Sequence, residues 1–234
     1  MKSQYVLPLT IVVAGVLIAG AVFLVGGGGA NPGSGGSTEV TAREYDPATD
    51  YILGNPNAPV KVVEYSDLEC PFCKEFHGTM HQIMQYYGDS GQVAWVFRHF
   101  PLAQLHSKAP QEAAAAECAG ELGGNEVFWK YIDRIFEITP SSNGLDLAQL
   151  PAVAGELGLD VNAFNQCLSS NKYAQKVSDS YAEAIALGAQ GTPFTFVMVA
   201  GEAITLPGNQ PYDSMRAAID AILVGLPAEG APAQ

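Results

Sequence analysis

A Cys-Pro-Phe-Cys motif at residues 70–73 is the feature that most restricts the fold of this chain. It lies between a run of β-branched residues at 60–65 and a segment at 70–87 whose apolar residues recur at helical spacing. These two patterns predict a buried strand followed by a helix that begins at the motif. Two cysteines at this spacing, where a strand gives way to a helix, indicate a thiol–disulfide redox centre.

The start of a helix favours a reactive thiolate at Cys70. A free cysteine, with a pKa of ~8.5, holds little thiolate at neutral pH, whereas the unpaired N–H groups of a helix N-terminus stabilise an anion. Pro71 takes the first helical position, where a missing N–H costs nothing. We expect Cys70 to be the exposed, attacking thiol and Cys73 the buried, resolving thiol. A plain structural disulfide is the alternative, although so short a loop gains the least stability.

A metal site competes with the redox interpretation. Cys70, Cys73, His77 and His81 are spaced C-x2-C-x3-H-x3-H. Zinc fingers place ~12–15 residues between the second cysteine and the first histidine, and four ligands on one helix do not easily surround a tetrahedral ion. Lys74, where covalent haem sites have histidine, excludes haem attachment. We therefore expect no metal and histidines at the surface or in a groove. A copper or zinc carrier using Cys70, Cys73 and His77 remains the alternative.

The rest of the chain predicts the order β-α-β, a large helical insert, then β-β-α. Further strands are expected at residues 93–97, 194–199 and 203–206, and a last helix at 212–224. The insert covers about 107–187. Breaks in it are expected at 123–124, 140–144 and 158. We expect the folded domain to span 50–226, with its structured part beginning between Tyr45 and Tyr51, and residues 227–234 to form a disordered tail.

The N-terminal residues predict a membrane anchor and a linker. Residues 5–25 contain no charged residue, and a helix of that length reaches ~30 Å. Lys2 precedes this segment, which places residues 1–4 in the cytoplasm and the domain on the extracytoplasmic side. A cleaved signal peptide is the alternative, but its apolar core would be only ~7–15 residues long. Residues 26–49, which begin with a glycine-rich run, predict a flexible linker.

Composition narrows the range of partners. The formal net charge of the 234 residues is −13, which disfavours binding to nucleic acid or to anionic lipid. With 48% hydrophobic residues, the chain can form a packed core without metals or disulfides.

Two segments resemble the DsbA family of exported thioredoxin-fold proteins from bacteria. They are EYSDLECPFC at residues 64–73 and GTPFTF at 191–196, in that order. The resemblance covers about 50–226 and implies an α/β thioredoxin fold with a large helical insertion, here preceded by a single transmembrane helix. It implies that Pro193 is a cis-proline facing the active-site disulfide, with Thr192 offering backbone hydrogen bonds to a bound peptide.

The resemblance also implies a role for Glu64. In such proteins an acid at this place lies buried beneath the resolving cysteine, where a carboxylate could take the proton from Cys73. A strand-end residue that faces solvent is the alternative for Glu64.

By this resemblance the chain is a protein disulfide oxidoreductase without an organic cofactor. Its substrates would be exported proteins with cysteines, and its redox partner a DsbB-like or VKOR-like membrane protein. Strongly oxidising members have histidine within the motif, where this chain has Phe72, and a less stable thiolate makes a less oxidising disulfide. We expect the chain to introduce disulfides, with a reductase or isomerase as the alternative.

Cys118 and Cys167 form a second pair within the insert. An even number of cysteines in an exported protein suggests pairing, and some DsbA-like relatives have a comparable bridge. A structural disulfide closing a loop of about 50 residues would contribute roughly 4 kcal/mol at most. Two free buried thiols or a second redox relay are the alternatives.

Overall fold

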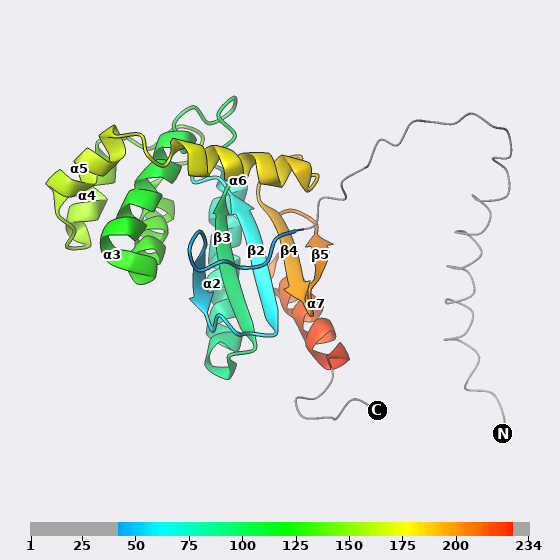
Figure 1. Cartoon of the computed structure of the whole chain (residues 1–234). Helices are drawn as coiled ribbons and strands as arrows, with labels where there is room; N and C mark the ends of the chain where they lie inside the picture. Colours follow the sequence, from blue (N-terminus) through cyan, green and yellow to red (C-terminus); the bar gives the residue numbers. More distant parts are fainter. Residues whose placement is uncertain (1–41, 227–234) are drawn as a thin grey trace, which may run out of the picture. The chain divides into compact units, whose positions relative to one another are not determined.

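The computed structural model describes residues 42–226 of the chain (Figure 1). The predicted cytoplasmic N-terminus, the anchor at 5–25, the first part of the linker and the tail at 227–234 lie outside these residues. Among the helices of the described part, none combines the length and the apolar character needed to cross a membrane.

A five-stranded sheet forms the centre of the described domain, in the order β1-β3-β2-β4-β5 (Figure 1). Strands β2 and β3 are parallel, and the other neighbouring strands are antiparallel. The strands are β1 (Tyr51–Gly54), β2 (Val60–Ser66), β3 (Val93–His99), β4 (Phe194–Val199) and β5 (Glu202–Leu206).

Helices cover one face of this sheet, and the segment before β1, together with part of α6, packs on the other (Figure 1). The helices are α2 (Pro71–Tyr87), α3 (Ala109–Ile138), α4 (Gln149–Glu156), α5 (Val161–Ser169), α6 (Ala174–Ala186) and α7 (Tyr212–Gly225), with a short 3-10 helix η1 (Gly88–Ser90) after α2. On one face α2 packs beside α7, where the Tyr87 hydroxyl donates a hydrogen bond to Asp220 (2.6 Å). Helices α3 to α6 form the insert, and α6 runs across the end of the sheet (Figure 1).

The central strand β2 sends side chains into two hydrophobic clusters. Val60 and Val62 belong to the cluster that contains both cysteines of the motif, whereas Val63 and Tyr65 belong to a second cluster that includes Ala184 of α6. Because both faces are covered, the strand carries apolar residues on both of its faces rather than on one.

The predicted order of elements is confirmed, with additions. The sequence patterns missed β1, which has only four residues and ends at Gly54, where φ is +97°. The insert breaks at Gly124 (φ +76°) and Gly158 (φ +79°), as expected, and also between α5 and α6. The contacts of the folded domain begin at Arg43, before the expected start between Tyr45 and Tyr51.

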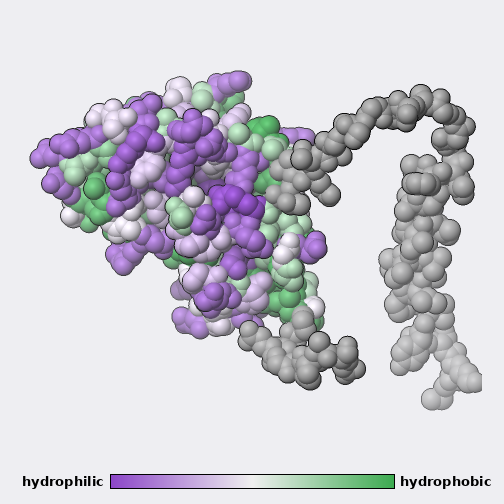
Figure 2. Space-filling model, in the orientation of Figure 1, coloured by the Kyte–Doolittle hydropathy of each residue, from purple (hydrophilic) through white to green (hydrophobic). Residues whose placement is uncertain are grey.

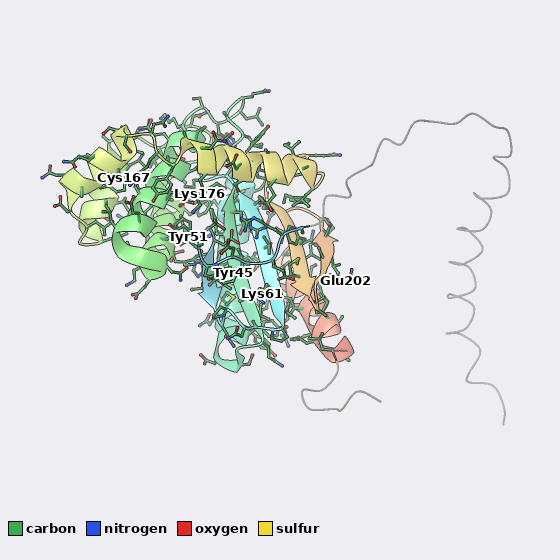
Figure 3. The ribbon with its side chains drawn as sticks, in the orientation of Figure 1. Tyr45, Tyr51, Lys61, Cys167, Lys176 and Glu202 are labelled. Carbon is green, nitrogen blue, oxygen red and sulfur yellow. A yellow bond between two sulfur atoms is a disulfide. The ribbon has the colours of Figure 1, made fainter. Side chains whose placement is uncertain are left out.

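Arg43 already belongs to the folded part, although it lies before Tyr45 in the chain. Its guanidinium donates two hydrogen bonds of 2.7 Å to Asp50, and Asp50 also accepts from the buried Arg98. Further along the same side, the Lys176 ammonium lies over the Tyr51 ring, 4.9 Å from its centroid (Figure 3). The end of the predicted linker is therefore held against the sheet.

The visible surface of the described residues is mostly hydrophilic (Figure 2). Hydrophilic residues cover most of the face shown in Figure 2, and apolar residues occur there in smaller patches. The buried apolar residues of the described domain are concentrated in the two clusters.

Candidate redox site

Cys70 occupies the junction between β2 and α2. It is the N-cap of α2, with extended backbone angles (φ −80°, ψ 123°), and Pro71 is the first helical residue. Its N–H donates to the Asp67 carbonyl (3.1 Å), and its own carbonyl accepts the first helical hydrogen bond, from Lys74 (3.0 Å). The sulfur of Cys70 therefore lies at the positive end of the helix.

Both thiols of the motif are largely covered. Cys73 is 0% exposed, as expected for a resolving cysteine, and receives a hydrogen bond from the Asp67 N–H (3.4 Å). Cys70 is only 5% exposed, so the expectation of an exposed Cys70 thiol is wrong. Phe72 between them is exposed, at 60%, and Pro71 is exposed as well.

The start of β4 explains the burial of Cys70. The Thr192–Pro193 peptide bond is cis, and the Cys70 thiol donates a hydrogen bond to the Thr192 carbonyl at 3.6 Å. Two segments separated by more than a hundred residues thus meet at the reactive sulfur, in the arrangement that the resemblance implies.

The surroundings separate the pKa values of the two thiols. The neighbouring Cys73 thiol and Thr192, together with hydrogen bonds from the backbone N–H groups of Cys73 and Phe72, lower the pKa of Cys70 to about 6, although burial opposes them. Burial, together with the neighbouring Cys70 and Glu64, raises the pKa of Cys73 well above its usual value. At neutral pH the thiolate therefore resides on Cys70.

Glu64 lies on the central strand with no exposure to solvent, so the solvent-facing alternative does not apply. Its Oε2 accepts a hydrogen bond from Trp95 Nε1 (3.0 Å), and its Oε1 has no partner among the described residues. Burial raises the pKa of Glu64 to about 8, and the negative charge of Cys70 adds to this effect. A carboxyl group that titrates near neutral pH can exchange a proton with Cys73.

Two acids just before the motif accept hydrogen bonds from segments far along the chain. Asp67 accepts hydrogen bonds from Leu102 N (2.7 Å) and from His106 Nδ1 (2.9 Å). Glu69 accepts from the backbone N–H groups of Gly144 and Leu145, each at 3.2 Å. Sequence patterns assigned no role to these acids, because their partners lie far along the chain.

Glu112, at the start of α3, is a further buried acid that the sequence did not single out. It is 0% exposed, and neither of its carboxyl oxygens has a hydrogen-bond partner within residues 42–226. Burial and the neighbouring Glu69 and Asp67 raise the pKa of Glu112 to about 9. The group is therefore an uncharged acid at neutral pH.

The histidines of α2 do not join the cysteines. Within the described residues, the potential metal ligands that come close together are His77, His81 and Asp133, and neither Cys70 nor Cys73 belongs to this group. His77 is 5% exposed and packs against Phe136, so the expectation that it is a surface or groove residue is wrong. The ligand set suggested by proximity in sequence, Cys70 and Cys73 with His77, is therefore not the one that the structure brings together.

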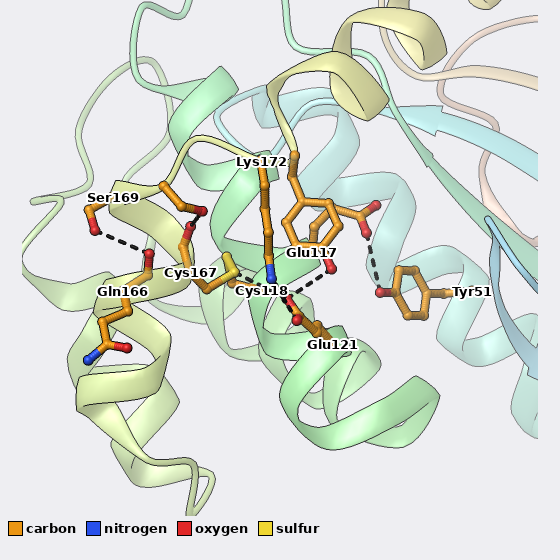
Figure 4. The surroundings of a disulfide bond; sticks show 10 residues. Tyr51, Glu117, Cys118, Glu121, Gln166, Cys167, Ser169 and Lys172 are labelled. Atoms are coloured by element: carbon orange, nitrogen blue, oxygen red, sulfur yellow. Dashed lines mark hydrogen bonds and ion pairs between the residues drawn. A yellow bond between two sulfur atoms is a disulfide. The ribbon is translucent and has the colours of Figure 1, made fainter.

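Cys118 of α3 and Cys167 of α5 form a disulfide with a Cα–Cα distance of 5.8 Å (Figure 4). Glu121 lies beside it and pairs with Lys172, and its Oε2 also accepts a hydrogen bond from the Tyr173 hydroxyl (3.0 Å). The bridge therefore ties α3 to α5 within the insert, at a distance from the motif in the sequence.

Comparison with known proteins identifies the fold. Residues 46–221 match the family model described as Thioredoxin. DsbA2 of Pseudomonas aeruginosa is similar over 77% of this chain and 96% of its own, with 28% identity and a TM-score of 0.63. The α-DsbA1 of Wolbachia pipientis is similar over 74% of this chain and 89% of its own, with 27% identity and a TM-score of 0.64. BdbD of Bacillus subtilis shares the fold (TM-score 0.69) at 22% identity, over 80% and 99% of the two chains.

Curated relatives show a partial match. A Na(+)/H(+) antiporter NhaA 1 of Mycolicibacterium gilvum is 34% identical over 157 residues, which are 66% of this chain and 24% of the antiporter. An antiporter NhaA of Herminiimonas arsenicoxydans is 35% identical over 152 residues, 65% and 23% of the two chains. The chain thus spans about a quarter of the length of these relatives, and the match concerns only that part of them.

Proposed function

Because the chain belongs to the thioredoxin family and is a DsbA-like protein disulfide oxidoreductase, we propose that it introduces disulfides into exported proteins. The low pKa of Cys70 is the observation that supports disulfide donation rather than disulfide reduction. A Cys70 thiolate that is more stable than that of a free cysteine favours the reduced form of the pair, and this makes the disulfide a better donor.

In the proposed reaction a client thiolate attacks the Cys70 sulfur of the oxidised protein. The Cys70–Cys73 bond breaks, a mixed disulfide forms between the client and Cys70, and Cys73 leaves as a thiolate that takes up a proton. A second client thiolate then attacks the client sulfur of the mixed disulfide and releases the Cys70 thiolate. The client loses two electrons and gains a disulfide, and the two cysteines of the motif gain those electrons.

Glu64 and the Thr192–Pro193 segment support two steps of this reaction. The carboxyl group of Glu64, with its pKa near 8, supplies the proton that the Cys73 thiolate requires. The Thr192 carbonyl, next to the Cys70 sulfur, accepts a hydrogen bond from the client backbone once the Cys70 thiol is consumed.

The proposal includes a membrane tether and a reoxidation partner. The uncharged segment at 5–25, preceded by Lys2, supports a helix that holds the domain at the extracytoplasmic face of the cytoplasmic membrane. A DsbB-like or VKOR-like membrane protein would then accept the electrons from the reduced motif. Ion transport does not follow from the antiporter relatives, since the chain matches only about a quarter of them.

Phe72 favours a second candidate, a reductase or isomerase of the same fold. This side chain is exposed and offers neither charge nor hydrogen bond to the Cys70 sulfur. The potential of the pair would then be set by Cys73, Thr192 and the backbone alone, at a less oxidising value than a histidine in the motif would give.

Oxidation of a reduced client tests the proposal. The full chain, first oxidised, is mixed with an equimolar unfolded protein that contains two thiols, and client disulfides are counted over time. We expect one client disulfide per chain, and no oxidation by Cys70→Ser. Cys73→Ala, treated with a disulfide-bearing client, should accumulate a mixed disulfide at Cys70. Rapid transfer of electrons from the reduced chain to client disulfides, without oxidation of reduced clients, would support the reductase instead.

A further inference from the structure

A triangle of three potential ligand atoms lies outside the redox motif, between α2 and α3. His77 Nε2 is 2.7 Å from Asp133 Oδ1, His81 Nε2 is 2.8 Å from the same oxygen, and the two Nε2 atoms are 3.1 Å apart. The histidines are four residues apart on α2 and therefore share one face of the helix. Asp133 comes from α3 and completes the group.

Hydrogen bonding alone does not account for this triangle. If both histidines donate from Nε2 to Asp133, their N–H groups meet each other across 3.1 Å. If only one Nε2 carries a proton, the lone pair of the other faces the carboxylate oxygen. One of the three contacts is repulsive in each arrangement. A cation at the centre removes this conflict, because each of the three atoms then points a lone pair at the cation.

The surroundings hold the group in place and leave it open on one side. The His77 ring is buried between Trp95 (5.0 Å) and Phe136 (4.5 Å), measured between ring centroids. The side chains of His81 and Asp133 are 41% and 39% exposed, so an ion can enter and a water molecule can take a fourth position. Among the described residues, the ion-pair partners of Asp133 are the two histidines, and no lysine or arginine neutralises it.

We propose that His77, His81 and Asp133 bind one divalent transition-metal ion of the zinc class, which links the redox helix α2 to the helical insert. Two imidazoles and a carboxylate suit zinc, and histidines at i and i+4 on one helix are a known zinc-binding spacing. Tetrahedral zinc, with bonds of ~2.0–2.1 Å, places neighbouring ligands roughly 3.3 Å apart, so binding opens the triangle by a few tenths of an ångström.

The role of this ion is to hold the two helices together. The residues between the histidines are Gly78, Thr79 and Met80, so the acid that hydrolytic zinc sites carry next to the first histidine is absent from this segment. The ion would connect α2, whose first turn carries Cys70, with α3 at Asp133. The proposal does not depend on the direction of thiol exchange.

Zinc titration of the oxidised full chain, purified without a histidine tag, tests the site. Oxidation of the motif removes Cys70 and Cys73 as thiolate ligands. We expect one Zn²⁺ per chain, and a rise in melting temperature with zinc concentration by mass action. Co²⁺ in place of Zn²⁺ should give visible d–d absorption without the near-ultraviolet band of a thiolate ligand.

Three variants decide whether these residues hold the ion. His81→Ala and Asp133→Asn change partly exposed side chains, and each should weaken Zn²⁺ binding by more than about tenfold. Gln82→Ala, on the exposed side of the same helix, is the matched control and should bind as the parent does. Absence of saturable binding, equal binding by His81→Ala and the parent, or binding only after reduction of the motif would each overturn the proposal.

Discussion

The Cys70 sulfur lies 3.6 Å from the backbone carbonyl oxygen of Thr192, to which the protonated thiol donates a hydrogen bond. This contact joins the start of α2 to the cis peptide bond before β4, and it covers a sulfur that the sequence alone placed at the surface. A client thiolate must therefore approach along the Thr192–Pro193 segment. The same backbone segment shields the Cys70 sulfur in the free protein and would contact the peptide of a bound client.

Phe72→His should make the motif more oxidising. Phe72 is exposed, so the substitution leaves the core intact, and a nearby imidazolium stabilises the Cys70 thiolate. If the pKa of Cys70 falls by about 1, the reduction potential becomes about 30 mV less negative. Alkylation of Cys70 as a function of pH measures the pKa, with the parent expected near 6. Phe72→Leu is the control, and an equal change in it would contradict an electrostatic effect.

Glu64→Gln should slow exchange at Cys73 without changing the pKa order of the two thiols. The amide cannot exchange a proton, so the step in which Cys73 gains or loses one slows by about tenfold or more. Client thiols ionise near pH ~8.5 in either reaction, so the ratio of the parent rate to the variant rate, rather than either rate alone, should change near pH 8, where Glu64 titrates. Stopped-flow measurement of client oxidation between pH 6 and about 9 gives both results. A variant that is slower but keeps the same pH profile would show a structural role only.

Glu112→Gln should stabilise the fold increasingly as the pH rises. The pKa of Glu112 is raised to about 9 in the folded state. The folded state is therefore favoured while Glu112 is protonated, and it loses stability as the pH rises from about 4.5 towards 9. Glutamine stays neutral and lacks this loss, which amounts to about 1.4 kcal/mol for each pH unit that separates the folded pKa from the unfolded one. Urea unfolding of both proteins at pH 5 and pH 9 measures the difference.

An exposed acid provides the comparison for Glu112. Glu126 pairs with Lys130 at the surface of α3, and Glu126→Gln should leave the free energy of unfolding nearly unchanged at either pH. If Glu112→Gln gains no more at pH 9 than at pH 5, Glu112 is not held as an uncharged acid in the folded state.

Removal of the Cys118–Cys167 disulfide should lower stability but leave the redox chemistry intact. The bridge closes a loop with a sequence separation of 49, and its loss should cost about 2–4 kcal/mol. The double variant Cys118→Ala, Cys167→Ala, compared with the oxidised parent in thermal unfolding, measures the loss. A melting temperature no lower than that of the parent would contradict a structural role. A large change in the potential of Cys70 would point to the redox relay instead.

Local patterns predicted the elements that carry the motif. The β-branched run before Cys70 and the helical spacing after it placed β2 and α2 within one or two residues, because both are decided by neighbours in sequence and by burial in the central sheet. The short edge strand β1 was missed, since four residues ending in glycine carry too little periodicity. The helix breaks at Gly124 and Gly158 could be read from glycine alone.

Contacts between distant segments could not be predicted. The burial of Cys70 depends on the start of β4, and the uncharged state of Glu112 depends on Glu69 and Asp67, whose positions follow from tertiary packing. The sequence suggested that the histidines of α2 share a metal site with the neighbouring cysteines, whereas the structure places Asp133 of α3 beside these histidines. Spacing along one helix identifies a face, and the fold decides what meets that face.

The reduction potential of the Cys70–Cys73 pair is the most direct test of the account. The full chain is equilibrated with glutathione buffers, and the fraction of reduced motif is measured by thiol alkylation. We predict a reversible two-electron couple between roughly −120 and −180 mV, in the range of disulfide donors. A value near about −270 mV would contradict the proposed direction and make the protein a reductant, and the absence of a reversible couple would contradict the assignment of the motif as its redox centre.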